Sequence, residues 1–304
     1  MRIAIFGAGG IGGYYGGLLA RAGHDVAFLA RGAHLAALRK TGLHVESVHG
    51  DFTLETIEAT DDAAQVGPVD LVLVTVKSYD LQQAAEGARP LLGPHTLLLP
   101  LLNGLDAADR LAAKLGDAPV LAGVTHISSS IAAPGLIRQV SSLRRIVLGE
   151  RNGEITPRAE RVRDVLAASG AEAILTPAID VALWDKFLFI ASVSGICCLA
   201  RQPIGPVMNT PETRQLYLDA LHEIEVLAQA RQVGLASDVV ERTVRLTEGF
   251  DPATRPSMLV DLQAGRRLEL EAMNGTVVRH SHETGIPTPV HRVVYAALKP
   301  SAAG

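Results

Sequence analysis

The sequence predicts an α/β fold in which an N-terminal Rossmann-type doubly wound sheet is followed by an all-α C-terminal domain. Short apolar runs alternate with helical segments through the first half, as in parallel sheets with helical crossovers. From Pro177 onward the chain instead shows helical patterning almost throughout. A chain of 304 residues is long enough for two cores, so we predict domains at residues 1–174 and 175–304.

The elements of the first half follow one another as strand and helix. An apolar run over 3–6 is bounded by glycines, as expected for a buried parallel strand, and a helix follows over 11–22. Residues 43–48 and 52–59 indicate a hairpin. Further strands are expected over 26–30, 71–76 and 96–102, and further helices over 33–40, 81–89 and 105–115. This alternation implies right-handed crossovers.

The pattern changes after about residue 120. We expect strands of a mixed sheet edge over 120–124, 135–140 and 145–149, then a helix over 156–169 and a strand over 172–175. The helices expected in the second half cover 180–199, 211–232, 238–248, 257–264, 268–284 and 290–299.

The composition argues against several classes of protein. Asp and Glu number 32 against 28 for Lys and Arg, and nucleic-acid or anionic-membrane binders are more often basic. Only 4% of residues are aromatic, which disfavours base-stacking surfaces. Cys197 and Cys198 are adjacent and predict neither a disulfide framework nor a metal site. Without a signal-peptide pattern or an apolar run near the ~18 residues of a membrane span, we expect a cytoplasmic protein.

A glycine-rich loop fits the pattern G-x-G-x-x-G and consists of Gly7, Ala8, Gly9, Gly10, Ile11 and Gly12. It follows the first predicted strand and opens the first predicted helix, the context in which this pattern binds a dinucleotide. Gly7 would allow the tight turn, Gly9 the approach of a pyrophosphate, and Gly12 close helix packing. The first helical turn would offer N–H groups to the phosphates. A strand–turn–helix with no ligand is the alternative.

The end of the second predicted strand indicates which dinucleotide is bound. A carboxylate about 20 residues after the glycines would accept the ribose 2′-hydroxyl of NAD. The sequence has Arg31 there instead, while Asp25 lies at the other end of the strand. A guanidinium suits a 2′-phosphate, so we predict NADP or NADPH as the cofactor. A solvated surface arginine is the alternative.

Two more polar side chains directly follow predicted strands. Lys77 comes after 71–76 and Asn103 after 96–102. Ligands of open α/β sheets bind beyond the carboxyl ends of the strands, so both are candidate cofactor contacts, and Asn103 also a substrate contact. Ordinary loop polarity explains either residue taken singly.

Two segments of the helical half carry candidate reactive groups. Lys186 lies in the helix over 180–199, which is apolar all round, and an ammonium there must find a partner or a wet cleft. A snorkelling lysine is the alternative. Ser257 and Asp261 share a helix face, and Glu269 follows as a surface charge or as the partner of a cation.

These features together resemble the ketopantoate reductase (2-dehydropantoate 2-reductase) family. The resemblance rests on the loop at 7–12, Leu29-Ala30-Arg31-Gly32, Val76-Lys77, Asn103-Gly104, Trp184-Asp185-Lys186, Ser257-Met258-Leu259-Val260-Asp261, Glu269 and Asn274-Gly275.

The resemblance implies an NADP-binding Rossmann domain, a helical domain and an active site between them. It implies that Lys186 is the proton donor and that Glu269 is a carboxylate near both the lysine and the cofactor. It also implies that Asn103 touches cofactor and substrate and that Ser257 lies on the carboxylate side of the substrate.

Three positions depart from the family pattern. Family members usually have asparagines one and two helical turns after the lysine, where this chain has Ile190 and Ser194, and a later asparagine falls near Ile204. Ser194 thereby becomes a candidate substrate contact. Loss of an amide at Ile190 removes a donor and an acceptor, which indicates a changed substrate.

The predicted function is NADPH-dependent reduction of a 2-oxo acid, namely 2-dehydropantoate (ketopantoate) to pantoate in pantothenate biosynthesis. A related NADP-dependent 2-hydroxy acid dehydrogenase with a bulkier substrate and a non-catalytic NADP-binding sensor are the alternatives. The expected partner is the small-molecule 2-oxo acid, with no nucleic acid, membrane or metal, and homodimer formation is left open.

Overall fold

The computed structural model describes residues 1–304 and divides into two compact units. Unit 1 comprises Met1–Leu102 and Asp106–Ile179, and unit 2 comprises Asn103–Leu105 and Asp180–Gly304. The domain boundary between residues 174 and 175 stays a prediction, because this division describes compactness and not independent folding. It nevertheless places Asn103–Leu105, a short segment beyond the last strand of the main sheet, in the helical unit.

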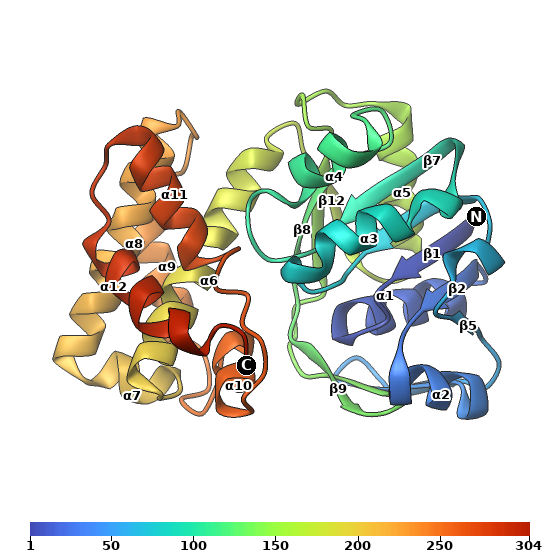
Figure 1. Cartoon of the computed structure of the whole chain (residues 1–304), viewed down its shortest axis with the longest axis horizontal. Helices are drawn as coiled ribbons and strands as arrows, with labels where there is room; N and C mark the ends of the chain where they lie inside the picture. The colour runs from blue at the N-terminus through green and yellow to red at the C-terminus, as the bar shows by residue number, and fades with distance from the viewer. The chain divides into compact units, whose positions relative to one another are not determined.

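A five-stranded parallel sheet forms the centre of unit 1 and confirms the predicted fold class (Figure 1). Its order is β5-β2-β1-β6-β7. The strands are β1 (Arg2–Phe6), β2 (Asp25–Leu29), β5 (Glu58–Thr60), β6 (Val69–Val74) and β7 (Leu92–Pro100). Their apolar residues are almost all buried, as in a sheet covered on both faces. The strand order reverses between β1 and β6, where ligands of such sheets bind.

Helices and short 3₁₀ turns connect the strands of unit 1. The helices are α1 (Gly10–Arg21), α2 (Gly32–Thr41), α3 (Leu81–Gly87), α4 (Ala107–Leu115) and α5 (Pro157–Ala168). The 3₁₀ turns are η1 (Ala63–Gln65), η2 (Ser78–Asp80) and η3 (Arg89–Leu91). The local sequence accounts for several of these ends. Thr156 caps α5 by accepting a hydrogen bond from the Ala159 N–H, and Gly42 ends α2 with φ at 75°.

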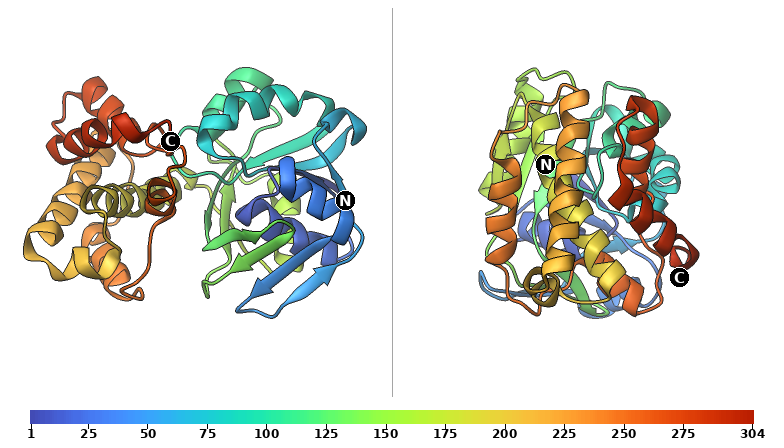
Figure 2. Two further views of the ribbon diagram at one scale, coloured as in Figure 1. Left: turned by 60° about the horizontal axis from the view of Figure 1, so that its bottom comes forward. Right: turned by 90° about the vertical axis from the view of Figure 1, so that its left-hand side faces the viewer.

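Two smaller sheets complete unit 1. A four-stranded sheet has the order β4-β3-β10-β9, and its strands are drawn in blue and green in the left view of Figure 2. A three-stranded sheet has the order β12-β11-β8. The strands are β3 (Leu43–Ser47), β4 (Phe52–Leu54), β8 (Ala122–His126), β9 (Ser129–Ala133), β10 (Leu136–Gln139), β11 (Arg145–Gly149) and β12 (Glu172–Leu175).

The sequence-based expectation for this region was partly wrong. The hairpin is real, since β4 pairs antiparallel with β3, but residues 52–59 do not form one strand. Their second part is β5, which leaves the hairpin and pairs parallel with β2. Strand β9 was not predicted, because Ser129–Ala133 has no alternation of apolar and polar residues.

Helix α1 contacts the main sheet through glycines. A Cβ at Gly12 would lie 2.3 Å from the Gly7 carbonyl oxygen and equally close to Thr75 Oγ1. A Cβ at Gly16 would lie 2.6 Å from the Phe28 ring and 2.7 Å from Ile5. Only glycine permits this approach, because any side chain would overlap backbone or buried rings.

The opposite face of α1 contacts the four-stranded sheet in the same way. A Cβ at Gly10 would lie 2.4 Å from the carbonyl oxygen of Ser129 on β9. A Cβ at Gly13 would lie 2.7 Å from Ile137 on β10, and one at Gly17 would lie 3.1 Å from the Phe52 ring on β4. Helix α1 is therefore packed closely between two sheets, which explains why it carries more glycines than the dinucleotide pattern requires.

Unit 2 is entirely helical apart from its connecting segments. Its helices are α6 (Ile179–Ala200, whose first residue belongs to unit 1), α7 (Ile204–Asn209), α8 (Pro211–Ala230), α9 (Val239–Glu248), α10 (Ser257–Gln263), α11 (Asn274–Thr284) and α12 (Pro289–Leu298), with a last 3₁₀ turn η4 (Lys299–Ser301). Helix α8 packs against α7, α9, α11 and α12. Helix α7 was not predicted. The helix expected over 268–284 begins only at Asn274, so Glu269 lies in the non-helical segment before it.

Helix α6 is long and apolar enough to cross a membrane by length and composition alone. Its mean hydropathy is 1.6, and 61% of the apolar window is buried inside the protein. Trp184, Phe187 and Leu188 belong to the core of unit 2. The core helix of a water-soluble protein has the same composition, so this helix is weak support for a membrane span.

Candidate functional site

The loops after β1, β2 and β6 lie at one edge of the main sheet. In the register of the parallel strands, Phe6 pairs with Leu29 on one side and with Val74 on the other. The glycine-rich loop follows the first of these residues, Arg31 the second and Lys77 the third. The structure thus assembles the sequence-predicted candidates of unit 1 along the carboxyl edge of three adjacent strands.

The glycine-rich loop turns sharply and leaves space beside its middle. Gly7 has φ at 104°, a conformation that favours glycine, and the N–H groups of Gly7 and Ala8 donate to Leu29 O at 3.2 and 2.9 Å. Thr75 Oγ1 donates to Gly7 O at 2.7 Å. A Cβ at Gly9 would meet no atom within 4 Å.

The start of α1 suits a phosphate. The helix begins at Gly10, has Gly9 as its N-cap and has no side-chain cap, so the N–H groups of its first turn are not used by a capping side chain. No acidic residue lies in this turn. Open space at the second glycine and uncapped N–H groups are the features that a bound pyrophosphate needs, so the residues fit a dinucleotide.

Arg31 and Lys77 follow the two strands on either side of β1, as the sequence predicts. Arg31 is exposed and is the N-cap residue of α2, and its Nη2 lies 3.4 Å from Gln83 Oε1 on α3. Lys77 is partly buried and is the N-cap residue of η2. A weakly held guanidinium at the end of β2 remains available to an anionic ligand.

The candidate reactive groups of unit 2 come together around Lys186. Lys186 Nζ donates a hydrogen bond to Asn103 Oδ1 at 2.8 Å, across 83 positions of the chain. Burial lowers the pKa of Lys186 to about 8, and the Glu269 carboxylate opposes this by raising it. Glu269 is itself buried, with 6% of its surface exposed. Lys186 is thus an ammonium with a neutral hydrogen-bond acceptor, a carboxylate nearby and a pKa of about 8.

The remaining candidates of unit 2 are not joined to this group by the contacts that the structure shows. Ser257 is exposed at the first residue of α10. Ser194 is fully buried two turns after Lys186, and its hydroxyl has no hydrogen-bond partner. Ile190 lies one turn after Lys186 and is partly exposed, whereas Ile204 is buried in the core at the start of α7.

Sequence reasoning missed two polar residues around the glycine-rich loop. Thr75 was included in a predicted strand, although it is the first polar residue after the apolar run of β6, which is a signal that could have found it. His34 on α2 accepts a hydrogen bond from the N–H of Gly135, 101 positions away, and no local pattern predicts such a contact.

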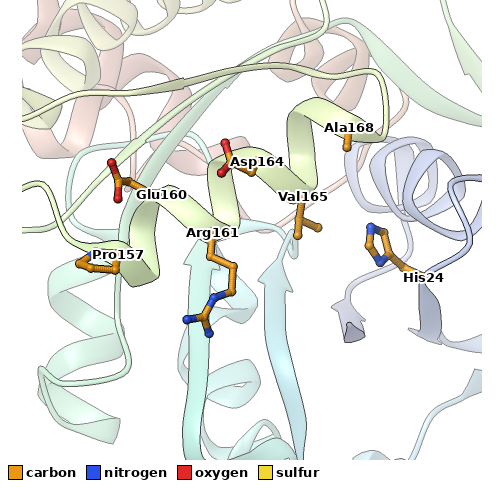
Figure 3. Close-up of a pocket in the computed structure, with 7 residues that line it drawn as sticks. All are labelled: His24, Pro157, Glu160, Arg161, Asp164, Val165 and Ala168. Carbon is orange, nitrogen blue, oxygen red and sulfur yellow. The ribbon is translucent and has the colours of Figure 1, made fainter.

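A surface pocket of unit 1 is lined by other residues (Figure 3). The residues that line it are His24, Pro157, Glu160, Arg161, Asp164, Val165 and Ala168. It lies along α5 and beside His24, which precedes β2 and therefore marks the amino end of that strand. None of the candidate residues lines it. No group of three or more His, Cys, Asp or Glu side chains is placed to hold a metal ion.

The fold and the loop define the chain as an α/β protein of the dinucleotide-binding class with a helical second unit. Sequence models described as "Ketopantoate reductase PanE/ApbA" and "Ketopantoate reductase PanE/ApbA C terminal" match residues 3–153 and 178–302. The chain belongs to the ketopantoate reductase family of oxidoreductases.

Individual relatives agree with this assignment over the whole chain. An uncharacterized oxidoreductase, YkpB of Bacillus subtilis, is 31% identical over 98% of both chains. A 2-dehydropantoate 2-reductase of Mesorhizobium japonicum is 29% identical over 98% of this chain and 97% of that protein. The crystal structure of 2-dehydropantoate 2-reductase from Geobacter metallireducens has a TM-score of 0.94 at 32% identity and covers 99% of this chain and 100% of that one.

A more distant likeness shows the fold alone. D-mandelate dehydrogenase in its ternary structure with NADH and anilino(oxo)acetate has a TM-score of 0.91 at 18% identity, covering 99% of this chain and 98% of that one. The same fold therefore serves in proteins of very different sequence.

Proposed function

We propose that the protein is an NADPH-dependent reductase that converts a 2-oxo acid to a 2-hydroxy acid, with 2-dehydropantoate as the substrate and pantoate as the product. The observation that carries this proposal is the hydrogen bond between Lys186 Nζ and Asn103 Oδ1, with Glu269 buried nearby. This lysine, with its pKa lowered to about 8, is a proton donor of the kind that reduction of a carbonyl requires.

The cofactor would be held by unit 1. The uncapped start of α1 would bind the pyrophosphate, Gly9 would let it approach, and Arg31 would pair with the 2′-phosphate. Lys77 would add positive charge at the same sheet edge. When bound, NADPH supplies the hydride for the keto carbon.

Lys186 would act on the carbonyl oxygen of the substrate. In its charged form it would donate a hydrogen bond to the oxygen, stabilise the negative charge that develops there and transfer a proton, so that the product is the 2-hydroxy acid and the lysine is left neutral. Solvent then returns a proton to the amine. Asn103 would hold the ammonium in place, and Glu269 would favour its charged form. Ser257 and Ser194 stay proposed substrate contacts.

The test is oxidation of NADPH by the purified protein against a panel of 2-oxo acids that includes ketopantoate. Turnover of ketopantoate with pantoate as the identified product supports the proposal. Tight NADPH binding without turnover of any 2-oxo acid would contradict it and would instead indicate a cofactor-binding sensor. We further propose a cytoplasmic protein that acts in pantothenate biosynthesis, which complementation of a pantothenate-requiring strain would check.

Ile190 favours one second candidate, a related NADP-dependent dehydrogenase with a different 2-hydroxy acid. The side chain one turn after Lys186 is partly exposed and offers no hydrogen bond. A substrate group beside the carbonyl would therefore meet an apolar surface, which suits an unhydroxylated alkyl or aryl group better than the hydroxymethyl end of ketopantoate.

A further inference from the structure

His34 lies where three parts of unit 1 meet. It is in the first turn of α2, three residues after Arg31. Its Nδ1 accepts a hydrogen bond of 3.1 Å from the N–H of Gly135, in the turn between β9 and β10. Its ring is also near the backbone of Ala8 in the glycine-rich loop, which acts to raise the pKa of the histidine. No other part of the proposed mechanism uses this side chain.

The hydrogen bond from Gly135 fixes the tautomer of the ring. A backbone N–H can only donate, so Nδ1 must carry the lone pair and Nε2 the proton. Burial lowers the pKa of His34, which favours this neutral form. The Nε2–H group thus has a defined direction and is a donor.

That donor is buried and incompletely paired. Nε2 is inaccessible to solvent and has no hydrogen-bond partner. The backbone of Ala8 acts on the ring by raising its pKa, and the only backbone atom there that can accept from Nε2–H is the carbonyl oxygen. Ala8 belongs to the loop that would hold the pyrophosphate. Leaving a buried donor without a partner is unfavourable, so a small adjustment of the loop that completes the bond would stabilise the bound state.

Contacts around Ala8 link the loop to the other elements that His34 touches. Its N–H is held by Leu29 O at 2.9 Å, at the end of the strand that precedes Arg31. Gly135 in turn lies against α2, because a Cβ there would be 3.1 Å from Ala37. His34 therefore connects the loop, the Arg31-bearing helix and the β9–β10 turn, whose strand β9 contacts α1 at Gly10.

We propose that His34 is a positioning residue for the cofactor: it holds the glycine-rich loop at a set distance from Arg31, and its Nε2–H completes a hydrogen bond to the Ala8 carbonyl when the dinucleotide binds. This inference rests on the proposed function. The ligand it serves is a dinucleotide with a 2′-phosphate, because only that ligand uses both the loop and Arg31. NADPH binding should depend on His34 more than NADH binding does.

The test compares His34→Leu with His34→Gln, and an exposed histidine of the same unit, His95, serves as the control in His95→Leu. Leucine can make neither bond, whereas glutamine offers an acceptor oxygen and a donor N–H. We expect His34→Leu to raise the NADPH dissociation constant about tenfold, the NADH constant no more than about threefold, and to leave kcat at saturating NADPH nearly unchanged. His34→Gln should recover most of the NADPH affinity.

Equal losses for the two dinucleotides, or the absence of rescue by glutamine, would overturn the proposal. If the leucine variant does not fold, ¹⁵N NMR of the wild-type ring decides: the Nε2–H tautomer should be present at neutral pH, and NADPH should shift the His34 Nε2–H resonance while the His95 resonance stays. A ring protonated at Nδ1, or one that NADPH leaves unmoved, would overturn it equally. Failure of the proposed function would appear differently, as absence of NADPH binding or of turnover in the wild-type protein.

Discussion

Lys186 Nζ donates a hydrogen bond of 2.8 Å to Asn103 Oδ1, and both residues belong to unit 2 although 83 positions of the chain separate them. An ammonium in an apolar helix is costly unless it is paired. A neutral amide pairs it without fixing its charge, in contrast to a direct carboxylate partner. The lysine can therefore change protonation state near neutral pH, as an acid–base group must.

Replacement of Lys186 by alanine should abolish most of the turnover and leave cofactor binding intact. The proton donor is lost, so kcat should fall by roughly 10²–10⁴-fold. The NADPH dissociation constant, measured by cofactor fluorescence, should stay near the wild-type value because unit 1 holds the proposed dinucleotide site. Steady-state rates close to those of the wild type would show that Lys186 has no such role.

The pH dependence of the reaction should follow the protonation of Lys186. Its pKa is about 8, and the charged form is the donor, so the rate of reduction should fall as the pH rises through about 8, while oxidation of the 2-hydroxy acid should rise over the same range. Glu269→Gln removes the charge that raises this pKa, so the descending limb should move to lower pH. Glu241→Gln, at an exposed carboxylate of the same unit, is the control and should leave the limb in place.

Arg31→Asp should change the cofactor preference. Loss of a charge-assisted pair with the 2′-phosphate and gain of a repulsive carboxylate should raise the NADPH dissociation constant roughly 10–100-fold, with a much smaller effect on NADH. Lys40→Asp makes the same change of charge at an exposed position of α2 and should affect the two cofactors alike. An equal loss for both cofactors with Arg31→Asp would contradict the 2′-phosphate assignment.

Alanine should impair stability at one glycine of the loop, Gly12, and dinucleotide binding at another, Gly9. At Gly12 the added Cβ would lie 2.3 Å from the Gly7 carbonyl oxygen, so Gly12→Ala should lower the free energy of unfolding by about 1–3 kcal/mol. At Gly9 the added Cβ meets nothing, so Gly9→Ala should keep the stability and weaken dinucleotide binding. Denaturant unfolding and cofactor titration of both variants check this, and unchanged cofactor affinity of Gly9→Ala would exclude the close approach of a phosphate there.

Ile190→Asn should move the substrate preference toward hydroxylated 2-oxo acids. An amide one turn after Lys186 would supply a donor and an acceptor that isoleucine lacks. The ratio of kcat/KM for ketopantoate to that for 2-oxo-3,3-dimethylbutanoate, which differs only by the hydroxyl, should rise about tenfold or more. Ile190→Val keeps the apolar character and is the control. An unchanged ratio in the asparagine variant would mean that this side chain does not face the substrate.

Much of the fold follows from short-range patterns. The apolar run and glycines at residues 3–12 predicted β1, the loop and α1, and the helical patterning after Pro177 predicted the helical half. Errors occurred where local signals are weak. Strand β9 lacks alternation, and the apolar residues between 268 and 273 are buried in turns instead of in a helix.

The sequence by itself determined the order of strands and helices, the glycine-rich loop and the identities of the candidate residues, because periodicity and backbone freedom act between near neighbours. Tertiary structure alone decided that Asn103 accepts from Lys186 and that His34 accepts from Gly135, since these pairs are 83 and 101 positions apart. It also decided that α1 is packed between two sheets. The hydrophobic periodicity of a helix indicates which face is buried, but only the folded structure shows which distant element covers that face.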